Sequence, residues 1–161
     1  MTQYHNIPPV YDKNSRILIL GSFPSVKSRE AQFFYGHPQN RFWKVMSAVL
    51  DCECPVTKEE KKLMLLSHNI AVWDVIGLCE ITGSSDASIS SVVPNDIAGL
   101  VAETSVTRIF ANGATSYNMY KRYCRDNVGI EAVKLPSTSP ANAAFSLERL
   151  ISEWKSQILS Q

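Results

Sequence analysis

A run of four consecutive apolar residues, Ile17 to Leu20, sets the strongest limit on how this chain can fold. Consecutive apolar positions in a strand place side chains on both of its faces, so other parts of the protein must cover both. The run ends at Gly21, and the polar segment S-F-P-S at 22–25 follows it. The sequence therefore predicts a buried strand whose carboxyl end opens into a loop, as in a parallel sheet covered by helices.

Three further apolar runs alternate with helical patterns along the rest of the chain. We expect strands at 16–20, 70–76, 108–111 and 130–135, and helices at 40–51, 57–67, 94–103 and 115–127. A last helix carries one apolar face made of Leu147, Leu150, Ile151, Trp154 and Ile158. Residues 1–13 are expected to form an arm, and 83–91 a serine-rich loop containing Asp86. Short strands separated by helices predict a three-layer α/β/α fold with a central four-stranded parallel sheet.

Bulk composition narrows the class of protein but not its function. The 161 residues suit one domain, 1–161, and the net charge of +1 gives no sign of a nucleic-acid partner. No apolar run reaches the length of a membrane span, so no membrane partner is expected. Residues 1–9 lack the apolar core of a signal peptide, which favours the cytoplasm.

The expected strand ends share an unusual composition. In a parallel sheet of this kind, ligands bind beyond the carboxyl ends of the strands. These ends fall at 21–24, 74–77, 112–113 and 136–142, and they are rich in Gly, Pro, Ser and Asn. The sequence therefore predicts a binding site where these four segments meet.

Two motifs at these positions resemble a known family. G-S-F-P-S at 21–25 with F-F-Y-G-H-P-Q-N-R-F-W at 33–43 resembles the first motif region of the uracil-DNA glycosylase superfamily. The run H-P-Q-N-R-F-W-K-V at 37–45 is similar to the mismatch-specific uracil glycosylases. Together with L-P-S-T-S-P-A-N at 135–142, the first motif is most similar to the hypoxanthine-DNA (deoxyinosine) glycosylase branch.

The resemblance implies an enzyme of base excision repair. Such an enzyme flips a deaminated base out of double-stranded DNA and hydrolyses its bond to the sugar. Hypoxanthine is the first expectation for the base, and uracil is the alternative. The motif segments at 21–25, 33–43 and 135–142 contain no lysine that could form an imine with the sugar, so a monofunctional glycosylase is expected.

Neither a cofactor nor a metal is expected. Some glycosylases of the superfamily carry an iron–sulfur cluster, which needs several cysteine ligands. A single residue separates Cys52 from Cys54, and Cys79 and Cys124 are isolated, so the usual spacing of metal ligands is absent. We expect four reduced thiols with structural roles.

Asn40 is the candidate catalytic residue, as the group that positions the attacking water. Many relatives carry a polar Asn or Asp two residues after the glycine that ends the first strand, where this chain has Phe23. Asn40 is the nearest amide that could take over this task. The alternative is that Asn40 only caps a helix, for which asparagine is highly favoured.

A second group of residues is expected to bind the flipped base through stacking and hydrogen bonds. Each has a structural alternative: Phe23 could equally belong to the core, His37 stands before a proline and could be structural, and Asn112 with Gly113 forms a pair that is common in turns. The expected base-binding residues are Ser22, Phe23, Phe34, Tyr35, His37 and Asn112.

A third group is expected to contact the DNA backbone. The segment 136–142 contains two prolines and several hydroxyls, and it resembles the loop that enters the minor groove in this superfamily. Its alternative is an ordinary connection between a strand and a helix. The expected DNA-binding residues are Ser25, Arg41, Ser137, Thr138, Ser139 and Asn142. The basic residues Lys121, Arg122 and Arg125 are expected on a solvated helix face.

Two other classes of function remain open. One is a module that binds nucleic acid without catalysis. The other is a small-molecule hydrolase that uses Ser22 or Ser137 as its nucleophile. The hydrolase is the weakest alternative, because the G-x-S-x-G turn is absent and neither serine has an evident histidine partner. No protein partner is implied.

Overall fold

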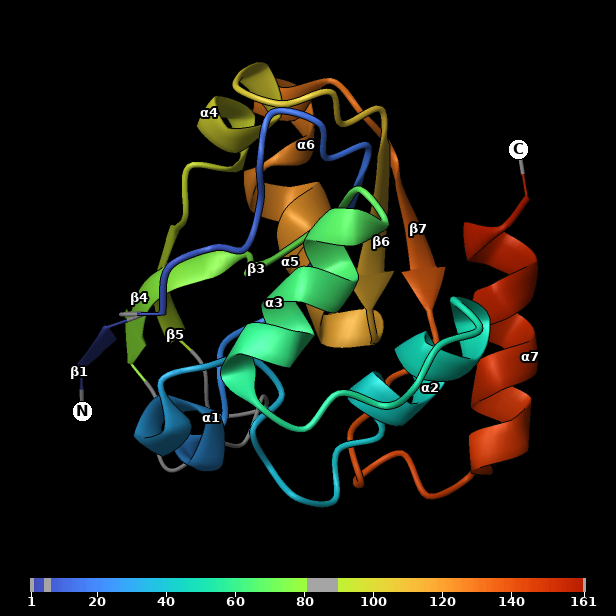
Figure 1. Ribbon diagram of the computed structural model, residues 1–161. Coiled ribbons are helices and arrows are strands. Elements are labelled where there is room, and N and C mark those ends of the chain that lie inside the picture. Colours follow the sequence, from blue (N-terminus) through green and yellow to red (C-terminus); the bar gives the residue numbers. More distant parts are fainter. Residues whose placement is uncertain (1, 5–6, 81–89, 161) are drawn as a thin grey trace.

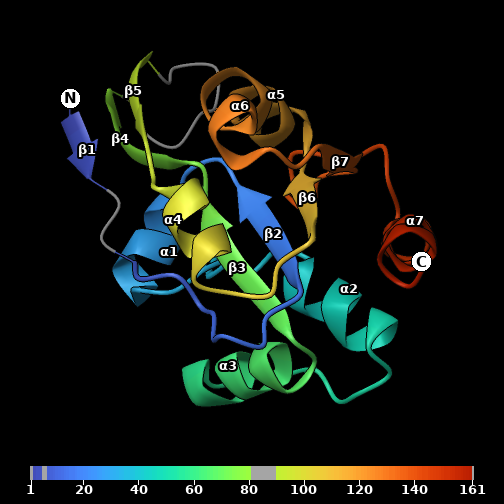
Figure 2. The ribbon, with the colours of Figure 1, turned by 90° about the horizontal axis from the view of Figure 1, so that it is seen from above.

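The computed structural model in Figure 1 describes residues 2–4, 7–80 and 90–160 of the chain. At its centre is a parallel sheet of β2 (Ile17–Gly21), β3 (Ile70–Asp74), β6 (Arg108–Asn112) and β7 (Ala132–Leu135). The strands lie in the order β3-β2-β6-β7. Helices cover both faces of the sheet, as Figure 2 shows. The predicted three-layer α/β/α fold is confirmed.

The first apolar run of the sequence forms an inner strand of this sheet. Leu18, Ile19 and Leu20 are fully buried, because β2 pairs with β3 on one side and with β6 on the other. Ile19 packs into a core with α2 (Phe42–Val49), α3 (Lys58–Ser67) and α7 (Leu147–Ile158). Leu18 and Leu20 pack into a second core with α4 (Ile97–Ala102) and α5 (Ala114–Tyr123).

Most helices begin where the sequence predicts. Thr57 and Glu60 form a capping box at the start of α3, Asp96 caps α4, and Ser146 caps α7. The helix predicted at 40–51 begins only at Phe42. The helix predicted at 115–127 is divided at Cys124 into α5 and the single turn α6 (Arg125–Val128).

A second, antiparallel sheet was not predicted. It consists of β1 (Thr2–Tyr4), β4 (Ile76–Glu80) and β5 (Ser90–Pro94), in the order β1-β4-β5. The strand predicted at 70–76 ends at Asp74, and the Val75 N–H donates to the Gly21 carbonyl at 2.8 Å. Asp86 lies outside the described residues. A short helix, α1 (Val26–Ala31), also follows the first loop and was missed.

The topology brings the loops of interest together. The next strand of this sheet along the chain, β3, lies on one side of β2, and the strand after it, β6, lies on the other side. The order of the strands therefore reverses at β2. Such a switch point leaves a crevice at the carboxyl ends of the strands. None of the described helices has both the length and the apolar composition to cross a bilayer.

Candidate active site

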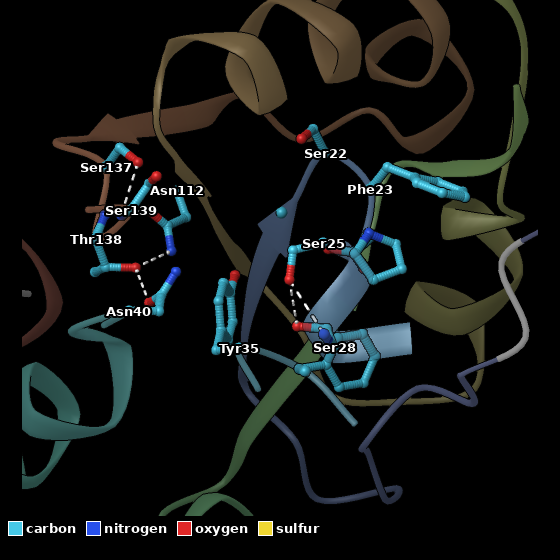
Figure 3. Close-up of a pocket in the computed structure, with 14 residues that line it drawn as sticks. Ser22, Phe23, Ser25, Ser28, Tyr35, Asn40, Asn112, Ser137, Thr138 and Ser139 are labelled. Carbon is cyan, nitrogen blue, oxygen red and sulfur yellow. Dashed lines mark hydrogen bonds between the residues drawn. The ribbon is translucent and has the colours of Figure 1, made fainter. Parts of the chain in front are cut away.

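A partly open cavity of about 150 Å³ lies at the carboxyl edge of the parallel sheet (Figure 3). Its walls come from the segments that follow β2, β3, β6 and β7, as the strand ends predict. The cavity collects these predicted site residues: Ser22, Phe23, Ser25, Phe34, Tyr35, Asn40, Asn112, Ser137, Thr138 and Ser139.

Thr138 joins the two asparagines of the site into one hydrogen-bonded unit. Its hydroxyl donates to Asn40 Oδ1 at 2.8 Å and accepts from Asn112 Nδ2 at 3.0 Å. Its backbone N–H donates to Asn112 Oδ1 at 3.0 Å. Thr138 is fully buried, so its side chain has no free surface for the DNA contact predicted for it.

This unit fixes the direction of the Asn40 amide. Asn40 Oδ1 accepts from both Thr138 and the Phe42 backbone N–H, the latter at 2.9 Å. Both uses of the oxygen are internal, and Nδ2 has no hydrogen-bond partner within the described part of the chain. Figure 3 shows this nitrogen turned away from Thr138, toward the side of the cavity where Tyr35 lies. Asn40 therefore supports the start of α2 and also presents a donor to the cavity.

Tyr35 provides a second donor. Its backbone has a φ of 53°, in the left-handed region, and its ring stacks on Phe42 with centroids 4.0 Å apart. The hydroxyl is buried and makes no hydrogen bond with any described residue. Burial raises the pKa of the phenol far above its usual value, and the charge of Asp74 adds to this rise. The nearby Asn112 amide lowers the pKa only in part, so the phenol keeps its proton.

Asp74 lines the same cavity and is a site residue that the sequence reasoning missed. It ends β3, lies opposite Gly21 in the register of the sheet, and is only 3% exposed. A side-chain carbon at Gly21 would overlap a carboxylate oxygen of Asp74 and would lie 3.2 Å from the Tyr35 hydroxyl. In the sequence, Asp74 is the only charged residue among residues 70–76, which was the available signal.

We expect the Gly21→Ala substitution to inactivate the site at moderate cost in stability. The added methyl group would push the Asp74 carboxylate out of position, and overpacking of this kind typically costs about 1–3 kcal/mol. Excision rate and thermal unfolding measure the two effects separately. Gly129→Ala is a poor control because that glycine has a φ of 81°, so Ala102→Gly, at an exposed position of α4, is the matched small change. Full activity in Gly21→Ala would show that the position of Asp74 does not matter.

The loop at 136–142 is held by internal bonds on several sides. The Arg41 guanidinium donates to the carbonyls of Ser139, Asn142 and Phe145, and the Arg41 N–H donates to the Thr138 carbonyl. Trp154 Nε1 donates to the Pro136 carbonyl at 2.9 Å. Gly113, with a φ of 95°, leaves room for Ser137, since a side-chain carbon there would lie 3.1 Å from Ser137 Cβ.

Three predicted site residues do not line the cavity. His37 Nδ1 accepts the Gln39 N–H at 3.1 Å in a local turn. Arg41 uses its guanidinium within the protein, as described above. Asn142 Nδ2 donates to the Ser137 carbonyl at 3.0 Å, and its side chain borders a neighbouring hollow that Ser137 and Ser139 also line.

The segment at 22–25, which follows β2, supports the local fold as well as lining the cavity. The Ser25 hydroxyl accepts the Ser28 N–H and so caps α1, while Ser28 Oγ accepts the Gly36 N–H at 2.8 Å. The Phe23 ring lies under the Arg29 guanidinium at 5.4 Å and packs against the second core. Figure 3 shows the ring directed away from the cluster of Asn40, Asn112 and Thr138.

Metal-binding and reactive groups are few in the described part of the chain. No three His, Cys, Asp or Glu residues there come together as metal ligands. Cys52, Cys54 and Cys124 are free thiols. Among the described residues lining the cavity there is no lysine.

The fold is that of a known enzyme class. The family model described as the uracil DNA glycosylase superfamily matches residues 8–159, and the chain belongs to this superfamily. The family predicted from the motifs is confirmed. A hypoxanthine DNA glycosylase of Methanosarcina acetivorans is 38% identical over 149 residues, which is 92% of this chain and 93% of that protein. A hypoxanthine DNA glycosylase of Methanosarcina barkeri is 32% identical, with coverage of 91% and 92%.

A solved structure extends the likeness to three dimensions. A solution NMR structure from Methanosarcina acetivorans, provisionally assigned to the uracil DNA glycosylases, superposes with a TM-score of 0.82. It is 34% identical in sequence, and the alignment covers 97% of this chain and 96% of that one.

Proposed function

We propose that this chain is a monofunctional DNA glycosylase that removes a deaminated base, with hypoxanthine as the main substrate, from double-stranded DNA. The observation that carries the proposal is the set of donors in the cavity. Asn40 Nδ2 and the Tyr35 hydroxyl both lack an internal acceptor among the described residues. Deamination of adenine replaces an amino group by a carbonyl oxygen, which needs such donors. The names of the two Methanosarcina relatives support the same base.

Uracil is the second candidate, for a chemical reason. Deamination of cytosine creates the same neighbouring carbonyl oxygen and N–H, so the same donors would serve it. Selection between the two then depends on how well a one-ring or a two-ring base fills the cavity.

The reaction breaks the bond between the base nitrogen and the sugar C1′, and the oxygen of a water molecule bonds to C1′. The base leaves with the bonding electron pair and takes up a proton, while the sugar passes through an oxocarbenium-like state. Donors aimed at the base stabilise the negative charge that develops on it. Because the Asn40 oxygen is already used twice, we assign Asn40 to the base rather than to the attacking water.

The remaining predicted residues take the following proposed places. Ser22, Ser25, Ser137 and Ser139 line the mouth and contact phosphates or the base edge, and Phe34 and Phe23 bound the cavity. Arg41 and Thr138 shape the loop at 136–142 from inside instead of contacting DNA, and His37 and Asn142 support local turns. Residues 1–161 act as one domain, and the cytoplasm stays the predicted location.

Duplexes that each carry one modified base test this function. We expect alkali-labile abasic sites at hypoxanthine, slower formation at uracil, and none at adenine or cytosine. The strand is expected to stay intact before alkali treatment, because no lysine lines the cavity among the residues that the structure describes. Excess chelator is expected to leave the rate unchanged.

The alternatives predict different results in the same assay. Tight binding of the modified duplexes with no abasic product would favour the non-catalytic module. An activity that chelator abolishes and zinc or iron restores would contradict the cofactor-free mechanism.

A further inference from the structure

Two serines on the α1 side of the cavity leave one hydroxyl hydrogen without a partner. Ser25 and Ser28 both line the cavity, and Ser28 is only 2% exposed. Ser28 Oγ accepts from the Ser25 hydroxyl at 3.1 Å and from the Gly36 N–H at 2.8 Å. These bonds occupy both lone pairs of the oxygen, since a hydroxyl has two lone pairs and one hydrogen. The hydrogen on Ser28 Oγ has no acceptor among the residues that the structure describes, so toward a ligand this hydroxyl acts as a donor.

The serine pair lies on a different side of the cavity from the amide that donates to the base carbonyl. Phe42 covers one face of the Tyr35 ring, with the two ring centroids 4.0 Å apart. Figure 3 shows Ser25 and Ser28 on the other side of Tyr35 from Asn40. A base whose carbonyl meets Asn40 and Tyr35 can therefore turn the edge beside that carbonyl toward Ser28.

Purines and pyrimidines differ at this edge. In hypoxanthine the lone pair of N7 lies next to the C6 carbonyl. In uracil the matching position, next to the C4 carbonyl, is occupied by the C5–H, which has no lone pair. A buried donor at this place pairs with a purine and is left unpaired by a pyrimidine, and an unpaired buried polar group is a strong source of discrimination.

We propose, on the basis of the glycosylase function above, that Ser28 is a specificity-determining residue whose hydroxyl donates to N7 of a flipped base and so selects deaminated purines over uracil. When the bond to C1′ breaks, the base keeps the electron pair, and negative charge spreads over both of its rings. A donor at N7 stabilises this charge. Ser28 forms no covalent bond in this role, and its proton stays on Oγ.

A purine that lacks N7 tests this contact by binding alone. Two duplexes carry hypoxanthine or 7-deazahypoxanthine, in which C–H replaces N7, each on a 2′-fluoro sugar. The fluorine disfavours positive charge on the sugar, so neither base is released during the measurement. We expect the wild type to bind the hypoxanthine duplex about 10-fold more tightly at one fixed salt concentration. The comparison needs no variant, so its result does not depend on whether a variant folds.

Two alanine variants separate the donor from the support of α1. Ser28→Ala removes the donor and should bind both duplexes equally; it also leaves the Gly36 N–H without its acceptor, so we expect a lower melting temperature. Ser25→Ala breaks the same bond between the hydroxyls and removes the cap of α1, but it keeps the Ser28 hydroxyl. Ser25→Ala should therefore retain the preference for hypoxanthine over 7-deazahypoxanthine.

Single-turnover excision provides the second measurement. Ser28→Ala should excise hypoxanthine about 10–100-fold more slowly than the wild type, while its rate on uracil, which has no N7, changes much less. Each variant is compared with the wild type on the same base, so the different leaving abilities of the two bases cancel. The exposed Ser156 of α7 undergoes the same chemical change in Ser156→Ala, which should alter neither rate.

Equal binding of the two purines by the wild type would overturn the proposal, as would a Ser28→Ala protein that keeps the preference for hypoxanthine. Equal slowing of hypoxanthine and uracil excision by Ser28→Ala would overturn it too, because Ser28 would then only support the fold. In each of these cases the wild type would still form abasic sites at hypoxanthine, so the glycosylase function would stand. A wild type that forms no abasic sites at hypoxanthine would instead contradict the glycosylase function, whatever the binding results.

Discussion

Replacing Asn40 by alanine is expected to slow excision about 10²–10³-fold, the usual effect of removing one donor that stabilises a developing negative charge. Affinity for duplex DNA should change little, since the donor acts mainly in the transition state. Alanine also removes the acceptor for the Phe42 N–H and the Thr138 hydroxyl, so a drop of several degrees in melting temperature accompanies the rate loss. Single-turnover rates measured well below the melting temperature separate the two effects.

Asn40→Asp is the sharper variant because of the direction of the amide. Aspartate keeps the oxygen that accepts from Phe42 and Thr138, but it replaces the cavity-facing NH2 by a second oxygen. A residue that only supports the helix would leave Asn40→Asp active. A donor to the base predicts a loss as large as that of alanine, at a melting temperature near the wild type.

The helix cap at Thr57 provides a control for the loss of stability in the Asn40 variants. Thr57→Ala removes the capping box of α3, which lies outside the cavity lining. Its melting temperature should fall without a change in the excision rate. Wild-type excision by Asn40→Ala would remove Asn40 from the mechanism.

The second large effect is expected at Thr138. Valine has nearly the same shape as threonine but lacks the hydroxyl, so Thr138→Val breaks the bonds to Asn40 Oδ1 and Asn112 Nδ2. Each amide then keeps only a bond from a backbone N–H and is held less firmly, and we expect excision to slow about 10–100-fold, with about 1–3 kcal/mol lost in stability. The backbone bond to Asn112 Oδ1 survives, which keeps the loop near its place.

Thr138→Ser distinguishes positioning from packing. Serine restores the hydroxyl but removes a methyl group from a buried site, so it should recover most of the rate while remaining less stable than the wild type. The opposite pattern, an active Thr138→Val and a slow Thr138→Ser, would mean that shape rather than the hydrogen bonds supports the site.

Much of the fold could be predicted because its signals are strong and local. The four central strands are short apolar runs, and the capping box at Thr57 marks the start of α3. The second sheet was missed because apolar residues resume directly after Asp74 and lead into β4, so one strand was expected where the chain changes sheets at Val75. α1 was missed because six residues are too few to show helical periodicity.

The cavity was predictable in location, but the roles of its residues depend on contacts between distant segments. Arg41 looked like a phosphate ligand because it is a basic residue near a helix start, yet its partners are carbonyls 98 to 104 positions away. Asp74 could be recognised only once its neighbours across the sheet, Gly21 and then Tyr35, were known. A sequence pattern does not show which way an amide points, so Asn40 was expected to position the attacking water.

The hydrogen bonds of Arg41 and Trp154 also bear on the stage of folding at which the site forms. One wall of the cavity belongs to the segment after β2, and the opposite wall at 136–142 is held by Arg41 and by Trp154 of α7. Contacts of such long separation form late in folding, because the intervening chain must first be brought to order. Thr138 is synthesised long after Asn40, and until then the amide has only the local Phe42 N–H as a partner for its oxygen. The wall of the cavity at 136–142 is therefore complete only when α7 is packed in place and Trp154 holds the Pro136 carbonyl.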